Sequence, residues 1–234
     1  MRPVESQKNF ADRKPSLARI VFNIAAAAVC AQAVSCGTLS QPAPQKAFFA
    51  ITPGEPSPAV APMSATSKAS TTMPGGAVLR VRRLRVASPY DGQAFVYQIR
   101  NDEFETDYYN GFIAAPDQLL TGSLIAWVSR AATFKSVVDV STGILARYVL
   151  EGNVTSLYGD YIDKAAPKAV MSIRIFLLDD RDADLRMIFQ KEYNATAPIE
   201  MGSAQSLVKG LSKAFRQILE QMTADLDERA AAGP

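Results

Sequence analysis

The sequence has no histidine and only two cysteines. Without histidine it lacks the commonest general base at neutral pH, the base of Ser-His and Cys-His nucleophile pairs, and the commonest metal ligand. Both cysteines, Cys30 and Cys36, lie near the N-terminus, so the rest of the chain can form neither a disulfide framework nor a CxxC metal site. These absences predict a protein that is not an enzyme and needs no cofactor and no metal.

Net positive charge is also absent once the first 35 residues are set aside. The formal charge of +2 over 234 residues depends on five basic residues that precede the first long apolar stretch. The chain after residue 35 is close to neutral, which argues against a protein that binds nucleic acid through its overall charge.

The first 35 residues have the layout of a secretory signal. A basic segment (1–19) precedes IVFNIAAAAVCAQAV (20–34), which is mostly apolar and ends in small residues. A transmembrane helix needs about 20 apolar residues, whereas this stretch is shorter and is interrupted by Asn23 and Gln32. We therefore predict a signal peptide over residues 1–35.

Cys36 separates two kinds of signal. The small residues of AQA (31–33) or AVS (33–35) suit an ordinary signal peptidase. With Cys36, the second of these also resembles a bacterial lipobox, although Ala33 stands where leucine is commoner. We predict that Cys36 is lipidated, because a cysteine here is otherwise unexplained and several acyl chains anchor a protein durably. Gly37 follows instead of the aspartate that retains such lipoproteins at the inner membrane, which favours the outer membrane.

Proline, serine and other small residues dominate the next segment. Residues 36–77 contain little to bury and are predicted to form a tether after the lipidated cysteine. KAFFAI (46–51) interrupts the segment, either as a strand docked on the domain or as an apolar patch in a linker. The domain itself is predicted over residues 78–228, with a disordered tail at 229–234.

Two helices and a set of strands are predicted within the domain. The helices span 115–131 and residue 203 to about 228, each with an apolar stripe at helical spacing, and Ser203 can cap the second. Such helices around antiparallel-style strands predict an α+β fold, with an antiparallel or mixed sheet and both helices on one face. The other face must then meet water, lipid or a partner. The predicted strands lie at 79–86, at 95–109 with a turn at Asn101-Asp102, and at 134–140, 148–161, 169–180 and 185–193.

Four arginines crowd the strand VLRVRRLRV. Its apolar alternation slips by one position at Arg82-Arg83, which a β-bulge would explain. The arginines can meet acidic phospholipid head groups or an acidic partner, but a solvated strand face is the commoner reason for such a charge run and is the interpretation favoured here. They are Arg80, Arg82, Arg83 and Arg85.

Aromatic residues gather in DYYNGF (107–112). Tyr108, Tyr109 and Phe112 surround Asn110-Gly111, which has the composition of a turn. Aromatic residues beside a turn serve either as core residues or as interface anchors. We predict that these three residues bind a partner protein.

Aspartates cluster in LLDDRDAD (177–184). A calcium loop needs ordered ligand spacing and a closing bidentate carboxylate, and this segment lacks both. A solvated hairpin turn is the favoured interpretation.

Two parts of the sequence are specific, namely FVYQ followed by YYNGFIAAP, and LEGNVTSLYGDY. Together with AVMSIRIFLLDD and IFQKEY they resemble a known family, the ABC-type transport auxiliary lipoproteins. The resemblance covers roughly residues 46–228, and Cys36 stands where that family has its lipidated cysteine. The long Pro/Ser-rich stretch 52–76 departs from the family pattern and puts the docking of KAFFAI in doubt.

The resemblance implies a periplasm-facing, non-catalytic lipoprotein. It would work with an MCE-domain protein, an ABC permease and an ATPase in moving lipid between two membranes. A homo-oligomer is a further assembly that the sequence leaves open. A lipoprotein of the lipopolysaccharide-assembly type and an inert structural protein of the cell envelope are the alternatives. A lipid hydrolase is disfavoured, because the chain lacks histidine.

Overall fold

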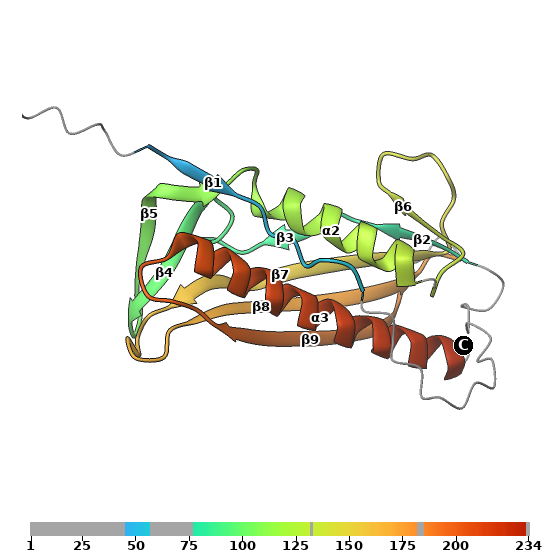
Figure 1. Cartoon of the computed structure of the whole chain (residues 1–234). Coiled ribbons are helices and arrows are strands. Elements are labelled where there is room, and N and C mark those ends of the chain that lie inside the picture. The colour runs from blue at the N-terminus through green and yellow to red at the C-terminus, as the bar shows by residue number, and fades with distance from the viewer. Residues whose placement is uncertain (1–44, 57–76, 132, 182–184, 233–234) are drawn as a thin grey trace, which may run out of the picture. The chain divides into compact units, whose positions relative to one another are not determined.

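The computed structural model describes residues 45–56, 77–131, 133–181 and 185–232. They belong to one compact unit that begins at Gln45. The predicted α+β fold is confirmed: within these residues a mixed sheet packs against two helices (Figure 1). Its elements are β1 Ala47–Phe49, β2 Val78–Val81, β3 Arg85–Val86, β4 Ala94–Arg100, β5 Glu103–Phe112, α2 Pro116–Ala131, β6 Ser136–Asp139, β7 Tyr148–Asp160, β8 Lys168–Asp179, β9 Arg186–Pro198 and α3 Ala204–Ala232.

The long strand β7 joins the two parts of the sheet. Along one edge it pairs antiparallel with β8, which pairs antiparallel with β9. Along the other edge three short strands, β2, β3 and β4, pair with β7 one after another, all in parallel. Strand β6 extends the sheet beyond β2, whereas β5 and then β1 extend it beyond β4.

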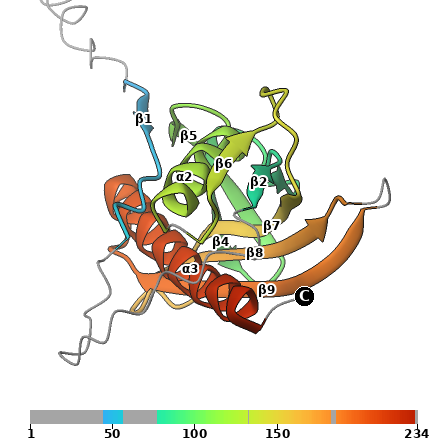
Figure 2. The ribbon, with the colours of Figure 1, turned by 90° about the vertical axis from the view of Figure 1, so that its right-hand side faces the viewer.

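Both helices lie on the same face of this curved sheet (Figure 2). Helix α2 buries its predicted stripe, including Leu120, Leu124 and Trp127, and the Trp127 indole Nε1 donates to Thr223 Oγ1 of α3 at 3.1 Å. Helix α3 packs on β8 and β9 and buries its own stripe, with Leu211 and Phe215 near its middle. These apolar faces form one hydrophobic core with the inner side of the sheet. The periodicity of the two helices therefore predicted their packing correctly.

The start of α3 is fixed by a cap and by a close approach to the sheet. Ser203 Oγ accepts from the Ser206 backbone N–H at 3.1 Å, as expected of an N-cap serine. A Cβ at Gly210 would lie 2.4 Å from Ile199 Cγ2 and 2.8 Å from Ala169 Cβ. The absence of a side chain at Gly210 thus lets α3 lie directly against β8 and the end of β9.

The chain before the Pro/Ser-rich stretch belongs to the fold. Strand β1 pairs in parallel with β5, so KAFFAI docks as a strand. Ile51 is buried in the core, and the Thr52 backbone N–H donates to Ser212 Oγ of α3 at 3.1 Å. The family-derived doubt about this docking is thereby removed for residues 47–52, while 57–76 lie outside the described residues.

Three local features differ from the sequence prediction. The expected single strand at 79–86 is two strands, because the chain leaves the ladder between Val81 and Arg85. Strand β9 continues to Pro198, since its second half alternates buried and exposed residues against β8. Helix α3 runs to Ala232 instead of ending near 228 before a disordered tail, as its alanine-rich end has high helix propensity.

Neither helix in the described part of the chain has the combined length and apolar character that crossing a membrane requires. The segment 1–35, which carries the predicted signal, falls outside those residues.

Candidate functional site

The predicted partner-binding residues all lie on β5, but the structure separates them. Tyr108 and Tyr109 are 72% and 44% exposed, whereas Phe112 is 3% exposed. The Phe112 ring packs edge-on against Phe95 with centroids 4.8 Å apart, inside the core. The assignment of Phe112 to a partner surface is therefore corrected: its side chain points into the core, and only the two tyrosines are accessible.

The two tyrosines are part of a larger exposed patch on the β1–β5 pair. Phe48 is 53% exposed and Ile113 is 59% exposed, and the Ile113 backbone N–H donates to the Phe49 carbonyl at 2.8 Å across the two strands. We call Phe48, Tyr108, Tyr109 and Ile113 the aromatic edge. Since β1 is the terminal strand of the sheet on this side, the patch lies at an edge of the molecule's sheet (Figure 1).

Contacts within the aromatic edge hold its tyrosines together. The rings of Tyr108 and Tyr109 meet edge to face, with centroids 5.0 Å apart. The Lys46 ammonium lies 4.5 Å from the centroid of the Tyr108 ring, in a cation–π contact. Aromatic side chains of this kind bury large area with few rotatable bonds when a partner covers them.

A bulge in β5, and not the expected turn at Asn110-Gly111, presents these tyrosines. Between the pairs Ala94–Gly111 and Val96–Thr106, β5 has more residues than β4. The Asp107 carboxylate fills the gap in the ladder: Oδ1 accepts the backbone N–H groups of Tyr109 and Asn110 at 2.8 and 2.9 Å. A side-chain acceptor thus replaces the missing strand partner of these N–H groups.

Further hydrogen bonds fix the Asp107 carboxylate. Its Oδ2 accepts from the Tyr97 hydroxyl and from Asn110 Nδ2, both at 2.9 Å. Partial burial acts to raise the pKa of Asp107, but the hydrogen bonds from Asn110, Tyr109 and Tyr97 outweigh it and lower the pKa below its ordinary value. Burial, the hydrogen bond to Asp107 and its charge raise the pKa of Tyr97. The bulge is therefore built around an ionised carboxylate.

The partner surface predicted from the sequence did not include Phe48 and Ile113. A usable signal was present in KAFFAI, because adjacent residues of a strand face opposite sides: once Phe49 packs inward, Phe48 must point outward. The position of Ile113 beside β1 depends on a pairing between segments far apart in the sequence.

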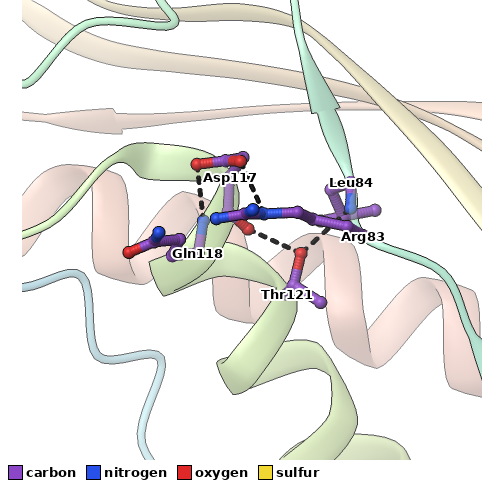
Figure 3. Close-up of polar contacts among 5 residues, drawn as sticks. All are labelled: Arg83, Leu84, Asp117, Gln118 and Thr121. Atoms are coloured by element: carbon purple, nitrogen blue, oxygen red, sulfur yellow. Dashed lines mark hydrogen bonds and ion pairs between the residues drawn. The ribbon is translucent and has the colours of Figure 1, made fainter. Parts of the chain in front are cut away.

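The crowded arginines lie where the strand is interrupted. Arg83 Nε donates to Asp117 Oδ2 at 2.7 Å, in the first turn of α2, and the Leu84 backbone N–H donates to Thr121 Oγ1 at 2.9 Å (Figure 3). Asp117 Oδ1 also accepts the Gln118 backbone N–H at 2.8 Å. The first turns of α2 therefore hold the break between β2 and β3 in place, with Leu84 buried in the core.

The aspartate cluster near residue 180 is described only outside residues 182–184, and its first aspartate is not solvated as expected. Asp179 is buried, and its Oδ2 accepts from Arg181 Nε at 2.9 Å and lies 3.8 Å from Arg147 Nη2. Arg147 and Arg181 thus neutralise a carboxylate at the end of β8. In the described part of the chain no three Cys, Asp or Glu side chains are grouped so that they could hold a metal ion.

Cys36, the predicted lipidation site, lies outside the described residues. Its acylation remains a prediction from the sequence.

Solved structures share this fold. A crystal structure of a protein from Xanthomonas campestris matches with a TM-score of 0.61 at 16% identity, covering 78% of this chain and 99% of that one. An uncharacterized protein matches with a TM-score of 0.54 at 17% identity, covering 79% and 98%. At these identities the likeness shows the fold alone. No curated protein matches the sequence.

A family model identifies the family of this chain, which the structural likeness alone does not show. The model of the ABC-type transport auxiliary lipoprotein component matches residues 58–223, which is well over half of the chain. The match includes the break after β2, the bulge of β5, all of α2, and α3 as far as residue 223. This chain belongs to the family of ABC-type transport auxiliary lipoprotein components.

Proposed function

We propose that this protein is a lipid-anchored, non-catalytic docking subunit of an intermembrane lipid transport system. In this proposal Cys36 carries the acyl chains, and the domain faces the periplasm from the outer membrane. Its partners are an MCE-domain protein and the associated ABC permease and ATPase. Membership of the auxiliary family supports a role beside an ABC transporter.

The observation that carries the docking role is the aromatic edge. It brings together four large apolar side chains that are all substantially exposed, at an edge where the sheet ends. Exposed apolar clusters of this kind commonly mark protein interfaces, and tyrosine is enriched among the residues that contribute most to binding. We assign the MCE-domain partner to this surface.

Capture of the partner tests this assignment. The protein and its Tyr108→Ala/Tyr109→Ala variant are purified from native membranes after mild crosslinking, and attached proteins are identified by mass spectrometry. We expect the variant to capture at least ten times less MCE-domain protein than the wild type. Truncating anchors at an interface commonly costs about 1 to 2 kcal/mol each.

A matched control uses exposed apolar residues elsewhere. Leu185 and Met187, at the β8–β9 end of the sheet, are exposed to a similar degree. Leu185→Ala/Met187→Ala removes comparable apolar surface and should leave capture unchanged. Equal capture by all three proteins would reject the aromatic edge as the docking surface.

The anchor has its own test. Cells are grown with a clickable fatty-acid analogue, and the purified protein is examined for label. We expect label on the wild type and none on Cys36→Ala, which should also leave the membrane fraction. An unlabelled wild type, or a Cys36→Ala protein still held at the membrane, would reject the anchor.

A further inference from the structure

The sheet face opposite the helices carries a second surface with a different chemistry. Along β8, Ile173, Ile175 and Leu177 are buried towards the helices, and Arg174, Phe176 and Leu178 alternate with them. By the alternation of a strand, this second set lies on the opposite face. Phe176 and Leu178 are only partly buried there, so apolar surface remains available.

A hollow of about 480 Å³ lies over this part of the face. Arginines from the break between β2 and β3 line one side of it, and apolar side chains from β8 and from the end of β6 line another. We call it the arginine hollow; its main lining residues are Arg82, Arg83, Arg85, Val140, Phe176 and Leu178.

Two of the arginines are held in ion pairs, and the third keeps its charge available. Arg82 is paired with Glu151 of β7, and Arg83 is paired with Asp117 of α2. Arg85 is exposed and has no ion-pair or hydrogen-bond partner among the residues that the structure describes. Since a carboxylate balances each of the other two, Arg85 gives the hollow its net positive charge. The paired guanidinium group of Arg82 is already positioned, so it loses less conformational entropy when it also binds an anion.

An exposed apolar loop adjoins the hollow. The β6–β7 connection begins at Val140, which lines the hollow, and continues through Ile144 to Leu145, which is 91% exposed. Arg80 Nη2 donates to the Ile144 carbonyl at 2.5 Å, so the loop is tied to the arginine-bearing strand. Large aliphatic side chains held this far into the solvent favour contact with an apolar ligand.

We propose that the arginine hollow binds the head group of an anionic phospholipid. Its phosphate lies against Arg82 and Arg85, and its acyl chains leave along Val140, Ile144 and Leu145. The juxtaposition of guanidinium groups with exposed aliphatic side chains matches a ligand that has both an anionic and a hydrocarbon part. An acidic peptide would satisfy the arginines but would leave the aliphatic loop uncovered. This inference goes beyond the proposed docking role and does not depend on the transport partner.

Titration with short-chain lipids tests the proposal. The full-length mature protein in a nonionic detergent is titrated with dihexanoyl phosphatidylglycerol, and bound lipid is measured by calorimetry and native mass spectrometry. We expect saturable binding of one lipid, tighter than that of dihexanoyl phosphatidylcholine and weakened by added salt. Arg85→Gln should weaken binding about fivefold, the effect of one basic residue near an anionic lipid.

Further variants separate the two halves of the site. Leu145→Gln should also weaken phosphatidylglycerol binding, because it removes an exposed aliphatic contact while leaving every charge in place. Arg100→Gln is the control, since Arg100 is an exposed arginine of the same sheet that pairs with Glu103 outside the hollow. Its affinity should equal that of the wild type.

Any of four results would overturn the proposal. The first is equal affinity for the two lipids, and the second is an Arg85→Gln variant that binds phosphatidylglycerol like the wild type. The third is glycerol phosphate competing as well as phosphatidylglycerol, which would assign the hollow to a soluble phosphate compound. The fourth is Arg85-dependent binding of a hexaglutamate peptide without lipid binding, which would assign it to an acidic protein.

Discussion

The two edges of β7 have different neighbours. Along one edge β8 pairs with it from Tyr148 to Asp160, interrupted by a single irregularity near Ser156. Along the other edge, β2, β3 and β4 each pair with it over only two or three residues. Helix α3 packs on the continuous side, on β8 and β9. One edge is thus a regular meander with a long helix, and the other is assembled from short pieces.

This difference separates the part of the sheet that closes the core from the part that carries the proposed binding surfaces. Two interruptions of the segmented half coincide with the surfaces described above. The break after β2 produces the arginine hollow, and the bulge in β5 produces the presentation of Tyr108 and Tyr109. The regular half keeps the core closed, so that irregularity elsewhere is tolerated.

The largest expected effect comes from breaking the regular half. Leu211→Asp or Phe215→Asp places an unpaired carboxylate in the middle of the buried stripe of α3. We expect a loss of several kcal/mol, comparable to the whole stability of the domain, and hence no cooperative thermal transition. Lys213→Asp, at an exposed position of the same helix, is the control and should melt near the wild type. A normal melt for Leu211→Asp would show that the stripe does not face the core.

An intermediate effect on stability is expected from truncating the buried aromatic residue of β5, in contrast to an exposed one. Phe112→Ala should cost about 3 to 5 kcal/mol, because it leaves a cavity beside Phe95. Tyr108→Ala should change the free energy of unfolding by no more than about 0.5 kcal/mol, as expected of an exposed residue. Urea denaturation of both variants measures the contrast. Similar losses for the two would mean that Tyr108 is also part of the core.

The smallest effect is expected at the bulge, and it should depend on pH. Because the pKa of Asp107 is lowered in the folded state, its carboxylate stabilises the fold above the ordinary aspartate pKa of about 3.9 and loses that contribution as pH falls. Asp107→Asn should therefore cost about 1 to 3 kcal/mol at neutral pH, since backbone N–H groups lose a charged acceptor. The difference from the wild type should shrink by pH 3.

Denaturation curves at pH 7 and pH 3 measure this effect. Asp91→Asn, at an exposed position before β4, is the control and should show little difference at either pH. If Asp107→Asn costs the same free energy of unfolding at both pH values, the charge of the Asp107 carboxylate does not contribute to stability.

Local patterns in the sequence predicted both helices and the long central strands. The apolar stripes of α2 and α3, the capping Ser203, and the alternation of β7 and β8 each depend on neighbours within a few turns or residues of the same segment. The turn at Asn101-Asp102 is equally local, and Asp102 adopts the positive φ of 63° that an aspartate tolerates well. Family motifs added the kind of system in which the domain works.

Only the tertiary structure determined the surfaces on the segmented half. Tyr108 and Phe112 belong to the same short aromatic segment, yet one is exposed and the other buried, because a bulge and pairing with β4 decide which way each side chain points. Likewise, Arg85 and Phe176 lie on separate strands and become neighbours only after β3 and β8 have paired with opposite edges of β7. The sequence alone predicted the two helices and most of the strands, since periodicity is a local property. The contacts that build the proposed binding surfaces are long-range, and the fold decides them.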